Sequence, residues 1–391
     1  MAGPFCSWSG IEPMRVDVAI VGGGIAGASA AYFLAKHGSV ALIEREQHFS
    51  YHSSGRTAAQ FTVGIGAPTM RRMAQASRAF LEAPPEGFAE QPILTPRGCL
   101  TVGRSEQAAT LHRLEEHLAS VGAQARRLSR DEALALFPAL RAERIDAGVY
   151  EPDAMDIDVD VLLQGYLRGA RAAGAHLFTR ADVQTIMRAD GRWRLSWNGG
   201  EIEAEVLVNA AGGWTDAVAA TAGLAPLGVV PHRRTAFTFA LQTEFDARDW
   251  PHVGTVDYDW YVKPEPGCLM GSLADAVPVA PFDAYPEDID VAQAIENIER
   301  DTRLRVGRPL SQWAGLRSFV RDRNPVAGMR REAPGFFWLA GQGGCGILTS
   351  PAMGQAIAAL VAGKPLPDPI KQLGVAEADL SPERESLDAG D

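Results

Sequence analysis

Short apolar runs flank a helical pattern near the start of the chain. Residues 16–21 (VDVAIV) and 40–44 (VALIE) have the continuous apolar character of strands buried on both faces of a sheet. Residues 25–37 between them follow a helical pattern, and Gly38 stands where a helix C-cap is expected. The order strand, turn, helix, strand forms a βαβ unit, which predicts a parallel sheet.

Later segments mix both kinds of pattern. Residues 129–132 (SRDE) predict a capping box that opens a helix, and residues 204–212 end in another buried strand. Residues 231–271 alternate between apolar and polar positions with turn residues, which predicts antiparallel strands. Three further segments have helical patterns: 158–173, 288–304 and 351–362. The polar, acidic tail from residue 365 is predicted to be mobile.

Composition narrows the class of protein. A chain of 391 residues, 46% of them apolar, exceeds what one core usually supports and predicts two domains. No apolar run is long enough to span a membrane, and a net charge of −11 argues against nucleic acid as a partner. The four cysteines have spacings that suit neither a metal site nor a disulfide framework, and we expect reduced thiols in a cytoplasmic protein.

A glycine-rich turn provides the first chemical signal. Gly22, Gly24 and Gly27 fit the pattern GxGxxG between a strand and a helix, where the backbone can approach a pyrophosphate. Glu44 ends the next strand, where its carboxylate can accept hydrogen bonds from a ribose. A plain glycine turn beside a surface glutamate is the alternative. The context favours dinucleotide binding.

Two further segments distinguish FAD from NAD. Residues 51–60 (YHSSGRTAAQ) are small or polar, which lets backbone groups press against a large flat ligand. Residues 340–347 (AGQGGCGI) form a second glycine-rich loop that runs into a helix, where negative charge on a reduced flavin can be stabilised. A plain turn is again the alternative for this loop. One nucleotide does not need two such loops, whereas a dinucleotide with a distant ring system does.

Together these motifs resemble the D-amino-acid oxidase superfamily of FAD-dependent flavoproteins. Within it the chain looks most similar to the bacterial D-arginine dehydrogenases, over nearly its whole length. The most specific matching segments are YHSSGRTAAQFTVGIG (51–66), VLVNAAGGW (206–214), PHRRTAF (231–237), WAGLRSFV (313–320) and GFFWLAGQGGCGI (335–347).

The resemblance implies an α/β fold with a discontinuous, Rossmann-like FAD-binding domain beside a substrate domain with a mixed or antiparallel sheet. The FAD-binding domain would comprise residues 14–90, 155–225 and 318–375, and the substrate domain residues 91–154 and 226–317. Residues 1–13 would be a disordered or non-native extension, with Met14 as an alternative start, and residues 376–391 a flexible tail.

The resemblance also implies site residues. Those expected to contact non-covalently bound FAD are Gly22, Gly24, Ile25, Ala26, Gly27, Glu44, Arg45, Ser53, Arg56, Thr57, Ala58, Val183, Ala211, Gly212, Trp214, Gly343, Gly344, Cys345, Gly346 and Ile347. Those expected around the substrate are Arg234, Arg317, Tyr261, Gln60, Cys99, Gly344 and Leu348. No metal site is expected.

The residues themselves support a carboxylate clamp. Arg317 lies inside an apolar run, an unusual place for a solvated charge, and a guanidinium is suited to a buried carboxylate. A structural ion pair is the alternative for Arg317, and a core aromatic is the alternative for Tyr261. Arg234 is singled out from Arg233 by the resemblance, since neighbouring residues of a strand point to opposite faces.

Departures from the D-arginine enzymes concern the substrate. Cys99 stands where those enzymes have a glutamate for the guanidinium, Gln60 replaces a histidine, and Ile65 and Leu348 replace polar residues. Without the carboxylate of that glutamate, arginine is an unfavourable substrate, because burying its guanidinium without a counter-charge is costly. A small or hydrophobic D-amino acid is therefore expected. His252 and Gly254 replace apolar residues of those enzymes, which argues against a less polar substrate pocket.

The predicted reaction is oxidation of the Cα–N bond of an amino acid by hydride transfer to flavin N5. The imino acid then hydrolyses to a 2-oxo acid and ammonia. Gln60 cannot titrate, so a water or His52 would take the amine proton. Met270 stands near the position of an oxygen-activating lysine in the sarcosine-type oxidases, which favours a dehydrogenase; a quinone, another carrier or O2 stays open as acceptor.

Several alternatives remain. A secondary amine such as sarcosine or proline, or glycine, is the second choice of substrate, and a D-2-hydroxy acid the third. An NAD-dependent dehydrogenase would leave the second loop without a role. A flavin monooxygenase would need further motifs, and a non-enzymatic flavin-binding protein would not need the arginine pair.

Overall fold

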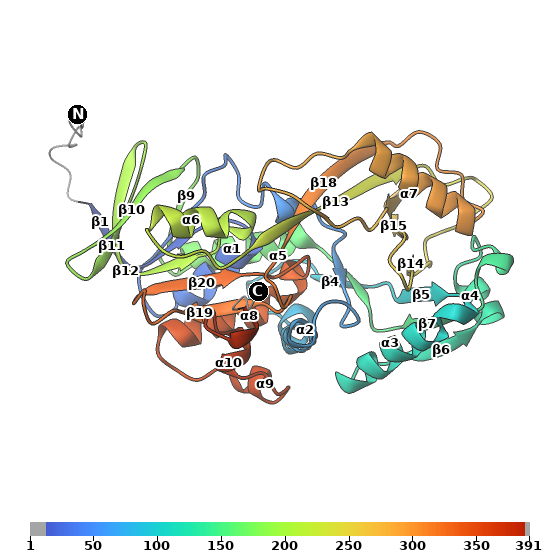
Figure 1. Cartoon of the computed structure of the whole chain (residues 1–391), viewed down its shortest axis with the longest axis horizontal. Coiled ribbons are helices and arrows are strands. Elements are labelled where there is room, and N and C mark those ends of the chain that lie inside the picture. The colour runs from blue at the N-terminus through green and yellow to red at the C-terminus, as the bar shows by residue number, and fades with distance from the viewer. Residues whose placement is uncertain (1–12, 388–391) are drawn as a thin grey trace.

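The computed structural model of the chain describes residues 13–387. The molecule is elongated, with one large sheet toward each end; two long strands of the second sheet, β13 (Val230–Phe239) and β18 (Ser311–Phe319), extend from it toward the first (Figure 1). The expected extension over residues 1–12 and the last four residues of the tail lie outside the described residues. Across residues 13–387, no helix combines the length and the apolar composition that crossing a bilayer requires.

The first sheet has eight strands and contains the predicted βαβ unit. Its path is β10-β11-β12-β1-β2-β9, and β20 pairs with β12 and β19. β1 is parallel to both β12 and β2, as expected for βαβ connections. The bounds are β1 Met14–Val21, β2 Val40–Ile43, β9 His176–Phe178, β10 Val183–Ala189, β11 Arg192–Trp197, β12 Gly200–Asn209, β19 Val326–Met329 and β20 Phe336–Ala340.

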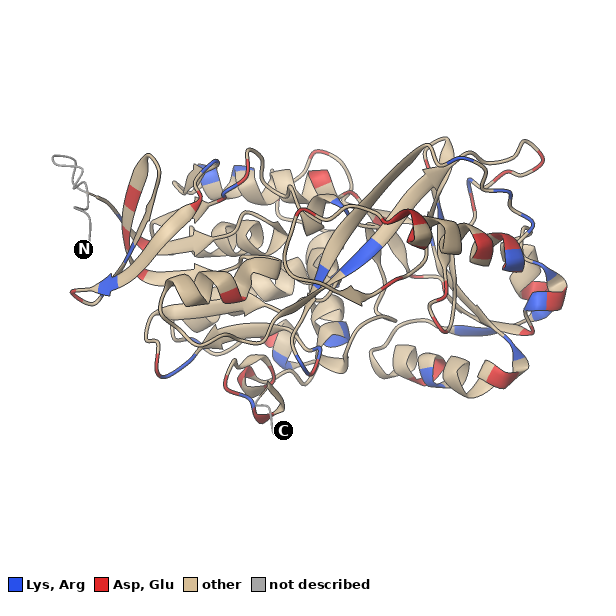
Figure 2. Ribbon diagram, turned by 45° about the horizontal axis from the view of Figure 1, so that its top comes forward, with Lys and Arg blue, Asp and Glu red and all other residues tan. Residues whose placement is uncertain are grey.

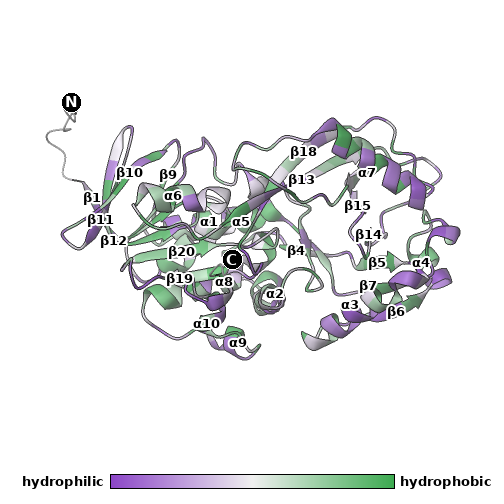
Figure 3. Ribbon diagram, viewed as in Figure 1, coloured by the Kyte–Doolittle hydropathy of each residue, from purple (hydrophilic) through white to green (hydrophobic). Residues whose placement is uncertain are grey.

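Both faces of this sheet are covered. One apolar cluster joins the sheet to α1 (Ile25–Leu34), α2 (Pro68–Glu82), α5 (Val159–Ala172) and α8 (Gly346–Val361). A second cluster, on the opposite face, includes Trp193, Phe336 and Trp338 together with Ala219 of α6 (Thr215–Thr221). Figure 3 shows hydrophobic residues concentrated in these strands and in the helices against them. The continuous apolar strands are thus buried on both faces.

The second sheet is mixed, as expected. It has nine strands in the path β17-β13-β16-β15-β14-β5-β7-β6, with β18 paired to β13. Its one parallel pairing joins β14 to β5, and its other pairs are antiparallel. The bounds are β5 Cys99–Gly103, β6 Arg126–Ser129, β7 Ala147–Glu151, β14 His252–Thr255, β15 Tyr261–Glu265, β16 Cys268–Ser272 and β17 Val277–Pro278.

Three helices flank the second sheet. They are α3 (Ala108–Ser120), α4 (Arg130–Leu136) and α7 (Asp288–Asp301). α4 opens with the predicted capping box, in which Ser129 accepts a hydrogen bond from the Glu132 amide and the Glu132 carboxylate accepts one in return. Charged residues gather on such peripheral helices and loops, whereas the central strands are mostly uncharged (Figure 2).

A small third sheet lies at the junction. It consists of β3 (Gln60–Phe61), β8 (Met155–Ile157) and β4 (Leu94–Pro96) in the order β3-β8-β4. The strands of the two large sheets come from the chain segments assigned to the two expected domains, and the exact boundaries stay a prediction. The α/β fold with mixed sheets matches the expected class.

Two helix ends differ from the sequence prediction. α1 ends at Leu34 with Ala35 as its C-cap, so Gly38 does not terminate it. A Cβ at Gly38 would lie 2.7 Å from Asp17 Oδ2, which accepts hydrogen bonds from Ser39. α8 begins at Gly346, five residues before the predicted start at Pro351. The helix tolerates Pro351 because the Ser350 hydroxyl donates to the Ile347 carbonyl, at 2.8 Å, which the proline nitrogen cannot do.

The predicted mobile tail is wrong for most of its length. It forms α9 (Asp368–Lys371) and α10 (Glu377–Leu380), and Leu366, Ile370 and Leu380 are buried in the first apolar cluster. Arg384 pairs with Asp322 at 2.7 Å. The apolar residues are spaced too widely along this polar segment to give a periodic pattern, and only their docking onto α2 and β19 reveals their role.

Candidate functional site

A long cavity follows the carboxyl edge of the first sheet. Its walls include Val21, Ile43, Ala210 and Ala340, which end or directly follow the parallel strands β1, β2, β12 and β20. In open α/β sheets ligands bind outside this edge of the strands. The cavity continues past the glycine loops to strands β13, β15 and β18 of the second sheet.

The first glycine loop is shaped for close backbone contacts. Gly22 has a φ of +108°, and a Cβ there would lie 2.5 Å from the Ala210 carbonyl oxygen. A Cβ at Gly27 would lie 1.9 Å from the Gly22 carbonyl oxygen, so α1 approaches the strand only because that side chain is missing. Glu44 accepts from the Gly23 amide at 2.7 Å and from the Glu46 amide at 2.8 Å. These bonds fix a buried carboxylate at the cavity wall.

The segment after β2 ties the two sheets together across the cavity. The Ser54 hydroxyl accepts from the Ile25 amide at the start of α1, at 3.0 Å. The Ser53 hydroxyl donates to the Leu316 carbonyl at 2.6 Å. Arg56 donates to the Ala314 carbonyl and pairs with Asp283. The short side chains of this segment therefore hold the backbone against the cavity, as the sequence suggested.

The second glycine loop meets the same cavity from the other side. No side chain caps the N-terminus of α8, and both amide atoms of Gln342 are buried without a hydrogen-bond partner. A helix N-terminus and an unpartnered buried amide suit a ligand that offers both hydrogen-bond acceptors and donors. Gly344 has a φ of +102°, and a Cβ there would lie 2.8 Å from Arg317 Nε.

Two arginines from adjacent strands converge on this part of the cavity. Arg234 of β13 and Arg317 of β18 both line it, and the charge of Arg317 acts on Arg234. Burial first, and then Arg317, lower the pKa of Arg234 to about 10. Arg234 donates to the Asp275 carbonyl, and its Nε lies 3.8 Å from the Asp275 carboxylate. No described carboxylate pairs with Arg317, so the two guanidinium groups together carry excess positive charge.

The neighbouring residue Arg233 has a different environment. It points to the other face of β13 and pairs with Glu287 and Asp290, each at 2.7 Å. The strand alternation that separates Arg233 from Arg234 is thus present.

Tyr261 also lines the cavity, beside Arg234. Its ring stacks on His252 with centroids 5.1 Å apart, and it packs with Met270. Tyr261 also acts on the Arg234 guanidinium and opposes the fall of its pKa. Tyr261 is both a packed aromatic and a cavity residue.

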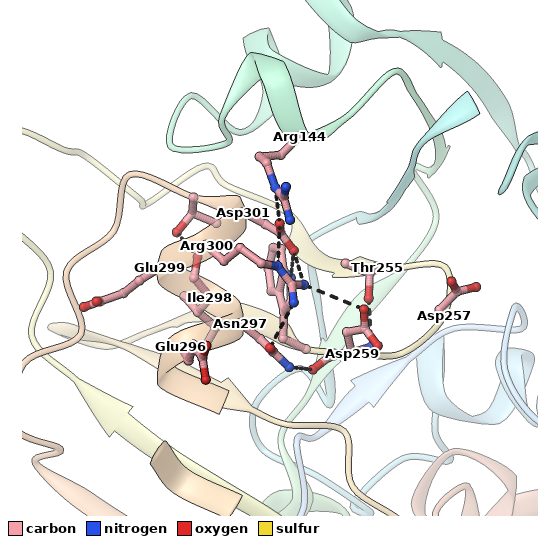
Figure 4. A network of polar contacts seen from close by, with 12 residues as sticks. Arg144, Thr255, Asp257, Asp259, Glu296, Asn297, Ile298, Glu299, Arg300 and Asp301 are labelled. Atoms are coloured by element: carbon pink, nitrogen blue, oxygen red, sulfur yellow. Dashed lines mark hydrogen bonds and ion pairs between the residues drawn. The ribbon is translucent and has the colours of Figure 1, made fainter. Parts of the chain in front are cut away.

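The loop before Tyr261 is anchored by a polar network on α7 (Figure 4). The Trp260 indole donates to Asp301 at 2.9 Å, and Asp301 also pairs with Arg144 and Arg300. Asn297 donates to the Asp259 carbonyl at 3.0 Å. This network fixes the entry of β15 and with it the position of Tyr261.

Most of the predicted site residues line the long cavity. Those that do are Gly22, Gly24, Ile25, Ala26, Glu44, Arg45, Ser53, Arg56, Thr57, Ala58, Val183, Ala211, Gly212, Trp214, Arg234, Tyr261, Arg317, Gly343, Gly344, Gly346 and Ile347. Five predicted residues are not part of its wall: Gly27, Gln60, Cys99, Cys345 and Leu348. Leu348 and Cys345 are buried in the first apolar cluster, directly behind the second glycine loop.

Gln60 and Cys99 form a separate contact beside the cavity. Burial raises the pKa of Cys99 to about 12, and the nearby Glu151 carboxylate adds to that rise, while Gln60 opposes it. Gln60 Nε2 is buried without a partner. The Cys99 thiol is therefore neutral at physiological pH. Cys99, Cys268 and Cys345 are all free, in agreement with the expected reduced thiols for this part of the chain.

His52 lines the cavity and contacts Glu46 and Trp214. Its Nε2 lies 2.9 Å from the Glu46 carboxylate, and its ring packs on Trp214 with centroids 4.5 Å apart. Arg45 covers the same Trp214 ring at 4.0 Å. These residues cluster around the Glu44 end of the cavity, which makes His52 a poor candidate for the amine proton.

Comparison with known proteins identifies the family. Residues 17–360 match the family described as FAD dependent oxidoreductase (DAO). The chain belongs to this family. Glycine oxidase of Geobacillus kaustophilus (strain HTA426) is 28% identical over 365 residues, which cover 89% of this chain and 93% of that protein. Human mitochondrial dimethylglycine dehydrogenase is 28% identical over 271 residues, 66% of this chain and 30% of that protein.

The structural comparison agrees. The crystal structure of the Geobacillus glycine oxidase gives a TM-score of 0.79 at 27% identity, covering 90% of this chain and 95% of that chain. The cofactor of this FAD-dependent oxidoreductase is FAD. The special similarity to D-arginine dehydrogenases stays a prediction.

The cavity fits FAD on its own chemistry. A helix N-terminus with a glycine turn suits the pyrophosphate, the Glu44 carboxylate suits a ribose, and the uncapped start of α8 suits an electron-rich ring edge. The unpartnered Gln342 amide lies on the wall between these groups.

The sequence reasoning missed several residues of the site. Asp275, which contacts Arg234, lies in a loop without a pattern of its own. The Trp260–Asp301 contact joins residues 41 positions apart.

Proposed function

We propose that this FAD-dependent oxidoreductase oxidises the Cα–N bond of a small amino acid that carries a free carboxylate. The observation that carries this proposal is the convergence of Arg234 and Arg317 at the flavin-loop end of the cavity. A pair of guanidinium groups with too little negative charge of its own is stabilised by a bound carboxylate.

The arginine pair would orient the substrate. With its carboxylate on Arg317 and Arg234, the α-carbon lies toward the wall formed by Gly343 and Gly344. The hydrogen bond from Arg234 to the Asp275 carbonyl holds that guanidinium in place. Bound FAD supplies the oxidant, accepting a hydride equivalent from the Cα–H bond. Positioning by the clamp is therefore the main contribution of these side chains.

The wall around the clamp excludes water. Met270, Ala274 and Tyr261 form a small apolar cluster, against which Ala58 and Trp313 pack. A dry environment strengthens the interaction between carboxylate and guanidinium. Neither Gln60 nor the engaged His52 is suited to accept the amine proton. A water molecule is the proposed acceptor, and the imino acid product hydrolyses to a 2-oxo acid and ammonia.

The expected side chain is small and not cationic. Cys99 is a neutral thiol where the resembling D-arginine enzymes carry a glutamate, so this position itself supplies no counter-charge for a guanidinium. A D configuration follows from the resemblance alone. Glycine or a secondary amine is the second candidate, because glycine oxidase and dimethylglycine dehydrogenase are among the relatives.

The electron acceptor is proposed to be a carrier other than O2. Met270 in β16 is 1% exposed and packs under Tyr261, where it offers no charge to stabilise reduced oxygen. Non-covalent FAD and a cytoplasmic location stay predictions from the sequence.

Anaerobic flavin reduction tests the proposal. The purified protein is mixed with D- and L-amino acids, glycine, sarcosine and proline, and bleaching of the flavin absorbance is followed. Reduction by D-amino acids supports the first candidate, and reduction by glycine or sarcosine alone supports the second. Arg317→Met should weaken reduction by every substrate, because each presents a carboxylate. A protein that no amine reduces would overturn the proposal.

A further inference from the structure

Arg71 is a buried guanidinium without a counter-charge. It lies on α2, and its Nε and Nη1 atoms are buried and have no hydrogen-bond partner among residues 13–387. Burial lowers the pKa of Arg71, and the only groups that oppose this effect are Tyr258 and Cys345, neither of which is a carboxylate. No ion pair joins it to a described acidic residue.

Several arginines of this chain with well-buried side chains are paired. Arg233, Arg384, Arg97 and Arg56 have side chains between 9% and 17% exposed, and each lies within 2.7 Å of a carboxylate oxygen. The fold therefore supplies counter-charges where an arginine only stabilises structure. Leaving a buried charge unpaired is costly, which calls for a partner from outside the chain.

Arg71 lies next to the candidate substrate site. The N-terminus of α2 packs on the second glycine loop: a Cβ at Gly66 would lie 3.4 Å from Cys345 Sγ and 3.0 Å from Met70. Burial raises the pKa of Cys345 to about 11, while the charges of Arg317 and Arg71 both oppose that rise. Cys345 is thus within the electrostatic reach of both guanidinium groups.

The surroundings of Arg71 are polar and unsatisfied. Gln75 stands one helical turn further along the same face, and its Oε1 is buried without a partner. Gln60 Nε2 is also buried and unpartnered, beside Cys99. The Tyr258 phenol is within the electrostatic influence of Cys99, Arg71, Cys345 and Arg317, which links the two regions. Two unused donors, Arg71 and Gln60, therefore lie beside the cavity, near Cys345 and Cys99, rather than on its wall.

We infer that the substrate of the proposed reaction carries a second carboxylate, which pairs with Arg71 while the α-carboxylate occupies Arg317 and Arg234. This inference rests on the proposed function and names its substrate class: a small dicarboxylic amino acid or amine. A guanidinium offers a planar fork of donors that matches a carboxylate, and Gln60 adds a further N–H. The Cys99 thiol beside Gln60 is neutral, and the nearby Glu151 carboxylate, whose pKa is raised by burial, already accepts hydrogen bonds from Thr62 and Val63.

Matched pairs of substrates test this inference. D-Aspartate is compared with D-asparagine, D-glutamate with D-glutamine, and iminodiacetate with sarcosine, so that each pair differs mainly in the second carboxylate. The rate constant of anaerobic flavin reduction and the substrate Kd are measured for each. In the wild-type protein at least one acid should exceed its neutral partner by on the order of 10- to 100-fold, as expected for a hydrogen-bonded charged group.

The variant Arg71→Met should abolish that preference. The acid loses its advantage and the neutral partner keeps its rate, because only the acid uses the guanidinium. Arg71→Lys retains the charge without the fork and should give an intermediate preference; it also serves if Arg71→Met fails to fold. Arg72→Met is the control, since Arg72 stands on the same helix and donates to the Gly374 carbonyl instead. FAD content and thermal unfolding are recorded for every variant.

Distinct outcomes separate this inference from the proposed function. Wild-type protein that is reduced by neutral amines but not better by any acid overturns the second carboxylate and leaves the proposed function standing. If Arg71→Met loses FAD and affects acid and neutral substrates equally, Arg71 contributes to cofactor binding, and the inference of a second carboxylate is also overturned. If no amine reduces the flavin, the proposed function itself fails.

Discussion

Substituting Gly344 with alanine tests the link between the second glycine loop and the arginine clamp. Gly344 has a φ of +102°, so any L-residue there is strained, by about 1–2 kcal/mol. The new Cβ would also lie 2.8 Å from Arg317 Nε and 2.9 Å from Cδ, closer than nonbonded atoms approach. Arg317 must therefore move away from the loop, and the clamp opens.

Gly363→Ala provides the matched control. Gly363 follows α8 with a φ of +63°, and a Cβ there meets nothing within 4 Å. Both variants should lower the unfolding temperature by a few degrees, since each adds strain of about 1 kcal/mol. Only Gly344→Ala should affect the substrate, because only its Cβ reaches Arg317.

The assay is anaerobic flavin reduction over a range of substrate concentrations. For Gly344→Ala the ratio of the reduction rate constant to Kd should fall by about 10- to 100-fold, the effect of misplacing a positioning group by up to 1 Å. Gly363→Ala should match the wild type in this ratio. Wild-type kinetics in Gly344→Ala would refute the claim that this glycine makes room for Arg317.

Three further changes have definite expected outcomes. Glu44→Gln should weaken FAD binding by about 10-fold, because the side-chain nitrogen of glutamine cannot accept one of the two hydrogen bonds from the Gly23 and Glu46 amides. FAD release on dilution is followed by fluorescence, and unchanged release would show that Glu44 is only a surface residue. Arg384→Met should lower stability by about 1 kcal/mol at pH 7, since the half-buried Asp322 loses its guanidinium partner but keeps its hydrogen bonds from Ser386 and Asn324. Burial would raise the pKa of Asp322, but hydrogen bonds from Arg384 and Ser386 outweigh it and lower that pKa to about 2 from 3.8. The Arg384–Asp322 pair therefore contributes fully to the free energy of unfolding above about pH 4, and this contribution is lost as the pH falls through about 2. The unfolding curves of the wild type and Arg384→Met should therefore converge in acid. Asp301→Asn should cost about 3 kcal/mol, because it weakens contacts to Arg144, Arg300 and Trp260; an unchanged unfolding temperature would show that the network in Figure 4 does not anchor the loop before Tyr261.

Local sequence determined the nucleotide-binding half of the molecule. The strands at residues 16–21 and 40–44, the glycine turn and Glu44 lie within 30 positions of one another, and a βαβ unit needs only short connections to bring them together. The fold class, the mixed second sheet and the capping box at Ser129 followed from periodicity and turn chemistry for the same reason. The clamp residues Arg234 and Arg317 required the resemblance to a known family as well.

Only the tertiary structure decided how distant segments share charges. Arg71 and Arg384 are both arginines in polar stretches, and nothing local distinguishes the unpartnered side chain from the one that Asp322 neutralises. The tail docks because Leu380 finds an apolar surface made by other segments, and α8 accommodates Pro351 because Ser350 replaces the missing donor. Burial and pairing are properties of the assembled chain, since they depend on which groups meet across the sequence. For this protein they decide which arginines have a counter-charge within the fold.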